Sequence, residues 1–144
     1  HFYKSEKGKR MLQVLLVGIG GCLGAICRYG IGQLCKLLPF TLPLATFLVN
    51  IMGAFFIGVF HGLASNQGIL SPNGLLFLTT GLLGGFTTFS TFSLESINLL
   101  EQGKIGIALS NIILQVGLGL LACYLGKILA SQSWQWMLFM IFCH

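Results

Sequence analysis

One stretch of this chain combines residue types that are unusual side by side in an apolar sequence. From Gly81 to Glu95 it reads Gly-Leu-Leu-Gly-Gly-Phe-Thr-Thr-Phe-Ser-Thr-Phe-Ser-Leu-Glu. Adjacent glycines followed by two threonines form a poor helix interior, so we expect a local break at Gly84 to Thr88. Carbonyl groups freed by a break at membrane depth must be satisfied by protein, water or an ion. If they turn inward they could hold a hard cation, which prefers oxygen ligands.

The residues after the expected break are suited to an anion. By the i, i+3, i+4, i+7 rule, one helical face carries Phe89, Phe92, Ser93 and Ser96. Phenylalanines in an apolar helix usually face lipid or the protein core, and that remains the simpler interpretation for an arbitrary pair. Here, however, they alternate with the hydroxyls of Ser90, Thr91 and Ser93, which lipid would not favour. Because a phenyl ring has a positive edge, rings presented edge-on can accommodate an anion without a formal charge.

Three other polar residues lie inside apolar stretches, where charged and polar groups are costly and are candidates for function. Arg28 either extends its side chain to the membrane interface or attracts anions at the mouth of a water-filled vestibule. Asn50 either forms a hydrogen bond across helices or offers its amide N–H to an anion. Glu95 could cap a helix end or pair with a cation. The sequence contains no nucleophile–base pair, phosphate loop, metal-ligand cluster or paired carboxylates, so it does not indicate an enzyme.

The composition indicates which kind of protein positions these residues. The chain has 144 residues, of which 55% are hydrophobic and only 8% are charged, whereas about 25% of residues are charged in a typical soluble domain. This excludes a soluble enzyme, a disulfide-rich secreted domain and a disordered chain. The net charge of +5 does not indicate nucleic-acid binding, because four of the eight basic residues lie within the first ten positions. We therefore expect a small all-α, multi-pass membrane protein.

Four apolar segments are each long enough to cross a bilayer, which takes about 20 residues. They run from about Met11 to Leu38, Leu42 to Leu63, Gly74 to Leu100, and Ile105 to Leu129. We expect one membrane domain over residues 11–130. Residues 1–10 would form a tail that need not be native, with Met11 as a candidate start. Residues 131–144 would form an interfacial tail, anchored by Trp134 and Trp136.

Glycine and charge patterns bear on assembly. Three pairs have the G-x-x-x-G spacing that lets helix backbones approach closely: Gly20/Gly24, Gly58/Gly62 and Gly81/Gly85. They suggest helix contacts beyond the needs of a single chain. With four spans, Lys127 lies on one side of the membrane and Lys36 and Lys104 on the other, once the first ten residues are left out. This near-absence of positive-inside bias would permit insertion in both orientations and an antiparallel dimer. If the first ten residues are native, the bias becomes five against two and favours a single orientation.

Three segments of the chain resemble the Fluc (CrcB) family of fluoride channels. They are Gly20-Gly-Cys-Leu-Gly-Ala-Ile-Cys-Arg-Tyr29, Thr46-Phe-Leu-Val-Asn-Ile-Met-Gly53 and Gly84-Gly-Phe-Thr-Thr-Phe-Ser-Thr-Phe-Ser-Leu-Glu95. The third segment is long and unusual in composition, so it is highly specific. With the length, the four spans and the weak charge bias, the resemblance covers nearly everything from Met11 to Leu129.

The resemblance implies a dual-topology, antiparallel homodimer with two fluoride pathways along the subunit interface. It implies a structural Na⁺ at the dimer centre, held by main-chain carbonyls of Gly84 and Thr87 from both subunits. Arg28 would lie near the aqueous vestibule. The implied pathway residues are Asn50, Phe89, Phe92, Ser90, Thr91 and Ser93. The implied role is passive export of toxic fluoride across a bacterial plasma membrane.

The fourth span departs from the family, in which a tyrosine and then serines line part of the pathway. Here Asn111 and Gln115 take those places, so a polar track survives and its details stay open. Two rival functions also remain. A small multidrug-type dual-topology antiporter would need a carboxylate near mid-membrane, usually in the first span, which has none between Met11 and Leu38. A non-conducting assembly subunit would explain the glycines but not Arg28 or Asn50.

Overall fold

The fold is known from a computed structural model that describes residues 2–37, 43–65 and 69–142, with side chains described for 6–37, 43–65 and 69–131. The expected turn from Pro39 to Pro43 falls largely outside these residues. The side chains of Trp134 and Trp136, expected as interfacial anchors, also lie outside them.

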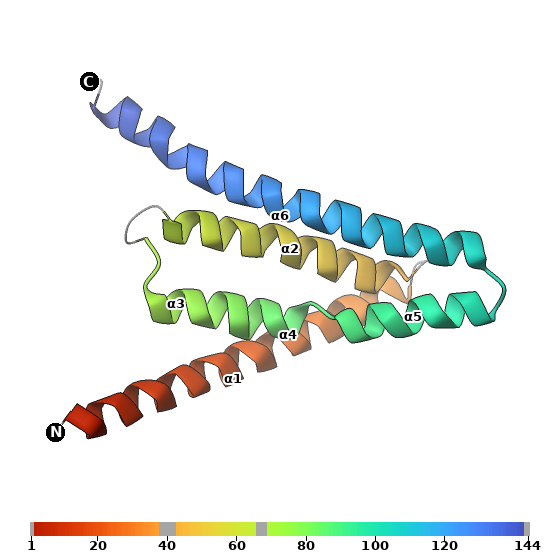
Figure 1. Cartoon of the computed structure of the whole chain (residues 1–144), viewed down its shortest axis with the longest axis horizontal. Helices are drawn as coiled ribbons and strands as arrows, with labels where there is room; N and C mark the ends of the chain where they lie inside the picture. The colour runs from red at the N-terminus through yellow and green to blue at the C-terminus, as the bar shows by residue number, and fades with distance from the viewer. Residues whose placement is uncertain (1, 38–42, 66–68, 143–144) are drawn as a thin grey trace.

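All the described secondary structure is helical (Figure 1). The first two membrane-length helices are α1 (Phe2–Cys35) and α2 (Leu44–Ser65), and the last is α6 (Ile105–Phe142). The third is built from four pieces in a row: α3 (Pro72–Leu76), the π-helical η1 (Phe77–Leu83), α4 (Gly84–Phe86) and α5 (Phe89–Glu101). Within the described residues, four helical stretches are long and apolar enough to cross a membrane. The expected four spans, with a break in the third, are confirmed.

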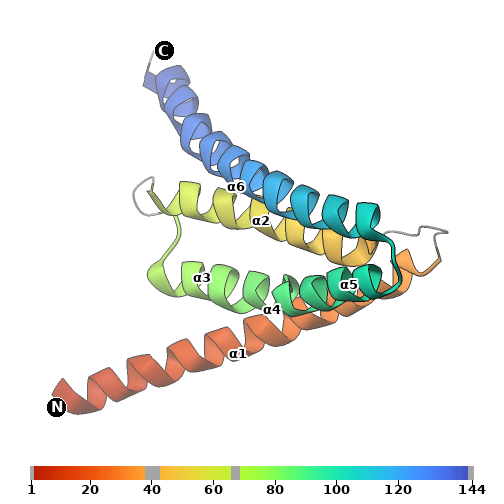
Figure 2. The ribbon, with the colours of Figure 1, turned by 45° about the vertical axis from the view of Figure 1, so that its right-hand side comes forward.

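The ends of the helices are arranged as four crossings require. The start of α1, the end of α2, the start of α3 and the end of α6 lie at one end of the molecule, and the α5–α6 turn lies at the other (Figure 1). Helical structure extends beyond the expected domain limits: α1 already begins at Phe2 and α6 continues to Phe142. Figure 2 shows that α1 and α6 diverge toward these outer ends.

The helices associate in two close pairs, α1 with the third helix and α2 with α6. Glycines make both approaches possible. In the first pair, Gly20 and Gly24 meet Gly81 and Gly85, so that backbone packs directly on backbone. In the second, a side chain at Gly58 would overlap the backbone of α6. The three G-x-x-x-G pairs therefore form contacts within one chain, and they do not account for an interface between chains.

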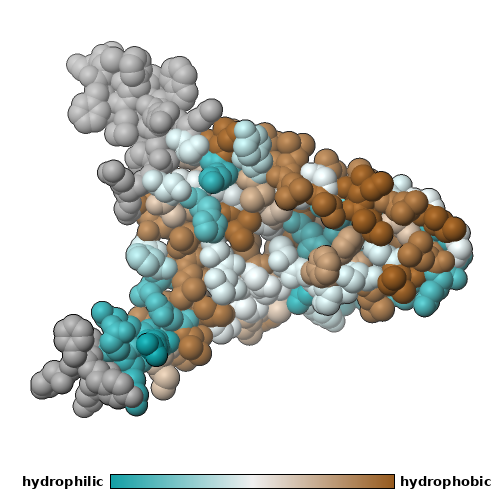
Figure 3. Space-filling view, viewed as in Figure 1, coloured by the Kyte–Doolittle hydropathy of each residue, from teal (hydrophilic) through white to brown (hydrophobic). Residues whose placement is uncertain are grey.

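The interior is small and the outside is apolar. The buried hydrophobic cluster at the centre consists of Val49, Leu83 and Phe86. Large hydrophobic side chains are exposed along α1 and α6. Figure 3 shows hydrophobic residues over much of α6 and a paler, more polar area over the middle of the third helix. An apolar exterior suits lipid, whereas polar groups at that depth require protein, water or an ion as neighbours.

We predict that Gly24→Ala destabilises the protein. The new methyl group would overlap the Leu82 carbonyl oxygen and lie 2.7 Å from the Phe86 amide nitrogen, both of which are backbone atoms. Because backbone cannot move aside as a side chain can, α1 would be forced away, at a cost of about 1–3 kcal/mol. Thermal unfolding in detergent measures this effect. The control is Gly18→Ala, since nothing lies within 4 Å of that position. Equal stability of the two variants would contradict the packing argument.

Candidate functional site

The break in the third helix is held open by a side chain of α2. In an uninterrupted helix, the amide of Thr88 would donate to the carbonyl of Gly84. Instead it donates to Oδ1 of Asn50 at 2.8 Å, and Nδ2 of Asn50 donates back to the Thr88 carbonyl at 3.2 Å. The carboxamide thus replaces the helical partners of one residue, and Thr87 and Thr88 adopt extended backbone conformations.

The helix restarts with a side-chain cap. The hydroxyl of Thr88 accepts a hydrogen bond from the amide of Thr91 at 3.2 Å, as an N-cap residue does. That amide would otherwise donate to the carbonyl of Thr87. The carbonyl groups of Gly84 and Thr87 are therefore among those that the break leaves without their usual helical donors, and those of Gly85 and Phe86 share this condition because α5 begins at Phe89. Gly84 and Thr87 are the two residues expected from the sequence to hold a cation.

A pocket of about 250 Å³ lies beside these two residues. Asn50, Thr79, Gly84 and Thr87 contribute to its lining, so it lies between α2 and the third helix. The oxygens available there are uncharged. This donor set fits a hard monovalent cation, because such ions prefer oxygen ligands and can be held by backbone carbonyls. No group of three or more His, Cys, Asp or Glu side chains suited to a metal occurs among the described residues.

Hydroxyl groups gather at the start of α5. The Thr88 hydroxyl donates to Oγ1 of Thr91 at 3.0 Å and lies 3.2 Å from the hydroxyl of Ser90. Ser93 lies one turn further, where its hydroxyl donates to the Phe89 carbonyl at 2.9 Å. A hydroxyl hydrogen rotates to suit its surroundings. A hydroxyl of this cluster can therefore give up its hydrogen bond within the protein and donate to an ion in its place.

The two phenylalanines next to these hydroxyls are in contact but differ in burial. The ring centroids of Phe89 and Phe92 are 5.5 Å apart, and the ring planes are inclined by 50°. Phe92 is buried, with 8% of its surface exposed, whereas Phe89 is 78% exposed. The two rings are therefore in contact, as the spacing predicts. Phe92 packs inside the chain, whereas Phe89 lies on its surface.

Behind the break, Asn111 and Gln115 of α6 are buried. Oε1 of Gln115 accepts from Nδ2 of Asn50 at 2.7 Å, and Nε2 of Gln115 donates to Oδ1 of Asn111 at 3.0 Å. Nδ2 of Asn111 donates to the hydroxyl of Ser96 at 3.1 Å, and that hydroxyl donates to the carbonyl of Phe92 at 2.8 Å. Both hydrogens of the Asn50 amide are consequently engaged within the protein.

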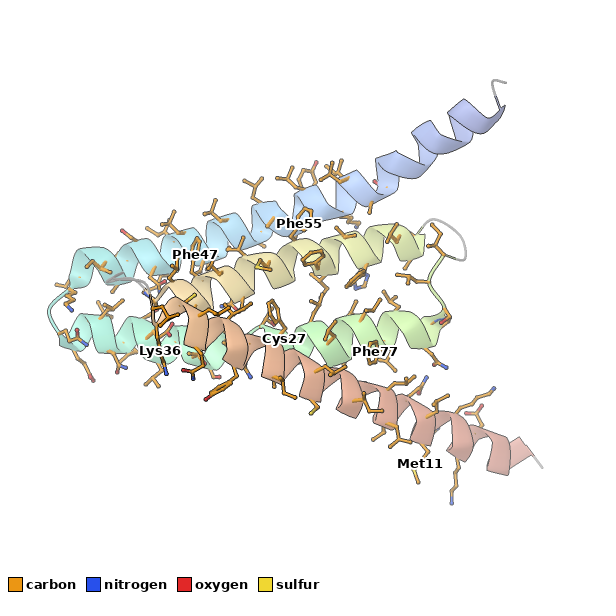
Figure 4. The ribbon with its side chains drawn as sticks, turned by 180° about the vertical axis from the view of Figure 1, so that it is seen from behind. Met11, Cys27, Lys36, Phe47, Phe55 and Phe77 are labelled. Carbon is orange, nitrogen blue, oxygen red and sulfur yellow. The ribbon has the colours of Figure 1, made fainter. Side chains whose placement is uncertain are left out.

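A larger cavity of about 770 Å³ opens between α1, α2 and α5. Its lining includes the polar side chains of Arg28, Tyr29, Lys36, Thr46, Thr88, Thr91 and Glu95. Figure 4 shows Lys36 at the end of α1, close to the start of α2. Arg28 therefore lines an open cavity that reaches Thr88 and Thr91, and its role in a vestibule stays a prediction. In the same cavity, Oε1 of Glu95 accepts a hydrogen bond from Thr46 at 2.8 Å.

The sequence assigned no contact to three residues of this site, although Thr88 lies in the expected break and Ser96 lies on the expected polar face. Thr88 caps α5 and belongs to the hydroxyl cluster, Thr46 contacts Glu95, and Ser96 connects Asn111 to α5. Thr88 carried a usable signal, because a threonine directly after an expected break is a candidate N-cap. The pairing of Thr46 with Glu95 joins residues 49 positions apart, and no local pattern reveals it.

Four membrane-length helices, with an interrupted third helix and polar groups at the interruption, define a small polytopic membrane protein. The chain matches the model of a family described as CrcB-like protein, Camphor Resistance (CrcB), over residues 15–127, and it belongs to this family. The similarity therefore includes all four spans.

Curated relatives agree closely with this chain over almost their whole length. It is 43% identical over 127 residues to the fluoride-specific ion channel FluC of Methylobacillus flagellatus, covering 87% of this chain and 99% of the relative. It is 47% identical to the protein of that name in Ruminiclostridium cellulolyticum, covering 85% and 95%. With fluoride-specific ion channel FluC 1 of Methanosarcina acetivorans the identity is 45%, covering 83% and 92%.

We predict that Thr88→Val lowers stability while preserving side-chain shape. Valine has no oxygen to accept from the Thr91 amide, and the loss of an N-cap costs about 0.5–2 kcal/mol. Unfolding by a denaturing detergent measures the change. Thr88→Ser keeps the hydroxyl and should retain most of the stability, and Thr80→Val tests the same substitution at an exposed position of η1. If Thr88→Val were as stable as Thr80→Val, the cap would have no energetic role.

Proposed function

We propose that this protein is a passive, fluoride-selective channel of the plasma membrane that exports cytoplasmic fluoride and so relieves its toxicity. The family and the names of the relatives, at 43–47% identity over most of the chain, support this function. The observation that carries the proposal is the cluster of uncharged hydroxyl donors and phenylalanine rings beside the break, at the inner end of an open cavity.

The chemistry of fluoride explains why such a site suits it. Fluoride is small and strongly hydrated, so its passage requires groups that replace water without holding the ion too tightly. Hydroxyl hydrogens and positive ring edges can share this task. Chloride is larger and needs less compensation. In a narrow pathway, the hydrogen-bond donors offset the cost of removing water only from an ion small enough to come close to them. Such a pathway therefore favours fluoride.

The proposed pathway begins at the cavity of Arg28, where a positive charge attracts anions. It continues along the start of α5, past the residues Phe89, Ser90, Thr91, Phe92 and Ser93. Asn50 contributes at the break, where its amide holds Thr88 in place. Asn111 and Gln115 lie behind Asn50 and are connected to the pathway through it.

The conducting unit in this proposal is an antiparallel homodimer. Phe89, Ser90 and Gly84 are exposed on one chain, although they lie in the middle of a membrane-spanning segment. Backbone freed by a break and a polar hydroxyl are unfavourable against lipid, so another protein surface should cover them. A second copy in the opposite orientation meets this need, and the weak charge bias of the loops permits it.

Na⁺ is the proposed structural ion of this dimer. The carbonyls of Gly84 and Thr87 would hold it, since both are without their helical donors and both residues line one pocket. Two such carbonyls from each copy would supply uncharged oxygen ligands. The ion would offset the partial negative charge of the carbonyls at the end of α4 and stay in place during conduction.

The first test is efflux from proteoliposomes, followed with fluoride and chloride electrodes while valinomycin supplies a potassium path. We expect rapid release of fluoride and retention of chloride. Phe92→Leu should lower fluoride release at least about tenfold, because leucine has no positive ring edge to offer the ion. The matched control is Phe56→Leu, an exposed position of α2. If neither ion is released by a folded dimer, the chain is a non-conducting assembly subunit. Unchanged release by Phe92→Leu would remove that ring from the pathway.

Replacing Na⁺ tests the cation separately. We expect that exchange of all Na⁺ for the larger, organic N-methylglucamine cation during purification weakens the dimer, because four converging carbonyls would repel one another without an ion. Chemical cross-linking in detergent reports the dimer fraction, and added NaCl should restore it. KCl at the same ionic strength is the control. A dimer fraction that does not depend on Na⁺ would contradict the proposed site.

A further inference from the structure

One continuous series of hydrogen bonds leaves the break, passes through two other helices and returns to α5. It begins at the amide of Thr88, and each acceptor residue donates to the next. The order is Thr88, Asn50, Gln115, Asn111, Ser96 and the carbonyl of Phe92. The series therefore starts and ends on residues 88–92, the segment that carries both phenylalanines. We call these five hydrogen bonds the amide chain.

The two members from α6 are hidden from the openings at the site. Asn111 is 3% exposed and Gln115 is 7% exposed. Neither belongs to the lining of the 770 Å³ cavity or of the 250 Å³ pocket, although Asn111 also borders a separate cavity of about 110 Å³ that is otherwise lined by Pro43, Leu44, Phe47 and Leu114. Polar side chains this deeply buried are destabilising unless their hydrogen bonds are made. Here the bonds are made to each other, to Asn50 and to Ser96, and not to an open space.

We propose that Gln115 and Asn111 are positioning residues, which orient Asn50 and hold the first turn of α5 without contacting the permeating ion. This inference rests on the proposed fluoride pathway, because its consequence is the placement of the groups that would meet fluoride. It revises the expectation that these two side chains line the pathway themselves.

The order of donors and acceptors along the amide chain explains how Gln115 and Asn111 orient Asn50. A carboxamide has an acceptor at one atom and donors at the other, so rotating one amide by half a turn would set two acceptors or two donors against each other. Gln115 presents its oxygen to Asn50, and this leaves the second hydrogen of Asn50 for the Thr88 carbonyl. Hydrogen bonds in a series polarise one another, which strengthens the whole arrangement.

Loss of the Gln115 acceptor would act on the break itself. The partly buried amide of Asn50 would then have an unpaired N–H and would turn away from Thr88 to satisfy it. The Thr88 amide would then lose its partner and become accessible to water from the 770 Å³ cavity that Thr88 lines. The start of α5 would shift, although no group facing the proposed pathway had been removed.

The test uses Gln115→Met, which keeps the length of the side chain and removes both its donor and its acceptor. We expect the dimer to persist, fluoride efflux to fall about tenfold, and hydrogen–deuterium exchange of the Thr88 amide to rise about tenfold. Asn111→Leu should act in the same direction. The double variant should be no worse than Gln115→Met alone, because the chain is already interrupted. Gln13→Met, at an exposed position of α1, should change neither efflux nor exchange.

Exchange at Thr88 that stays at the wild-type rate in Gln115→Met would overturn the proposal, whatever happens to the efflux. If Gln115→Met does not fold, Gln115→Glu takes its place. As a neutral acid, that side chain can accept from Asn50 and donate to Asn111, whereas the ionised form cannot donate. Efflux relative to wild type at the same pH should therefore rise as pH falls, and a constant ratio would overturn the proposal. Failure of the proposed function is distinct, since the wild type itself would then release no fluoride.

Discussion

The pair of hydrogen bonds between the Asn50 side chain and the backbone of Thr88 is the interaction on which the site depends. A helix interrupted at membrane depth leaves backbone groups that lipid cannot satisfy. A carboxamide carries its donor and its acceptor on separate atoms, so the side chain of Asn50 can donate to the Thr88 carbonyl and accept from the Thr88 amide at the same time. Thr88 is then free to cap α5, which presents the hydroxyl cluster, and the carbonyl of Gly84 is released.

Close glycine packing makes this pairing possible by fixing the helices on either side of it. The contacts of Gly20 and Gly24 with Gly81 and Gly85 fix α1 against the third helix, and Gly58 lets α2 approach α6. Between these two pairs the hydrophobic core is small. Near the centre of the molecule, hydrogen bonds to Asn50 therefore set the distance between the helices. In most soluble proteins a packed apolar core sets this distance.

The amino-acid pattern predicts the features of this fold that are local. Long apolar runs define the spans, and the Gly-Gly and Thr-Thr pairs between Gly84 and Thr88 define the break. The pattern does not predict which helices pair or which faces meet, because apolar residues face both lipid and protein in a membrane helix. The partners of Asn50 are therefore hidden in the sequence: Thr88 and Gln115 lie 38 and 65 positions away. The G-x-x-x-G spacing likewise indicates close contact without saying whether the contact lies inside one chain.

In the proposed channel, charged side chains lie where anions would enter, and neutral side chains lie where fluoride would pass. Arg28, Lys36 and Glu95 all lie on the open cavity, so formal charge is present where water is present. Deeper in the site, the side chains around the break are hydroxyls, carboxamides and phenyl rings. A full positive charge at that depth would bind a small anion tightly and slow its release, whereas several weak donors can pass it onward. Neutral donors held in place by the amide chain can therefore replace the water lost by the ion and still release it quickly.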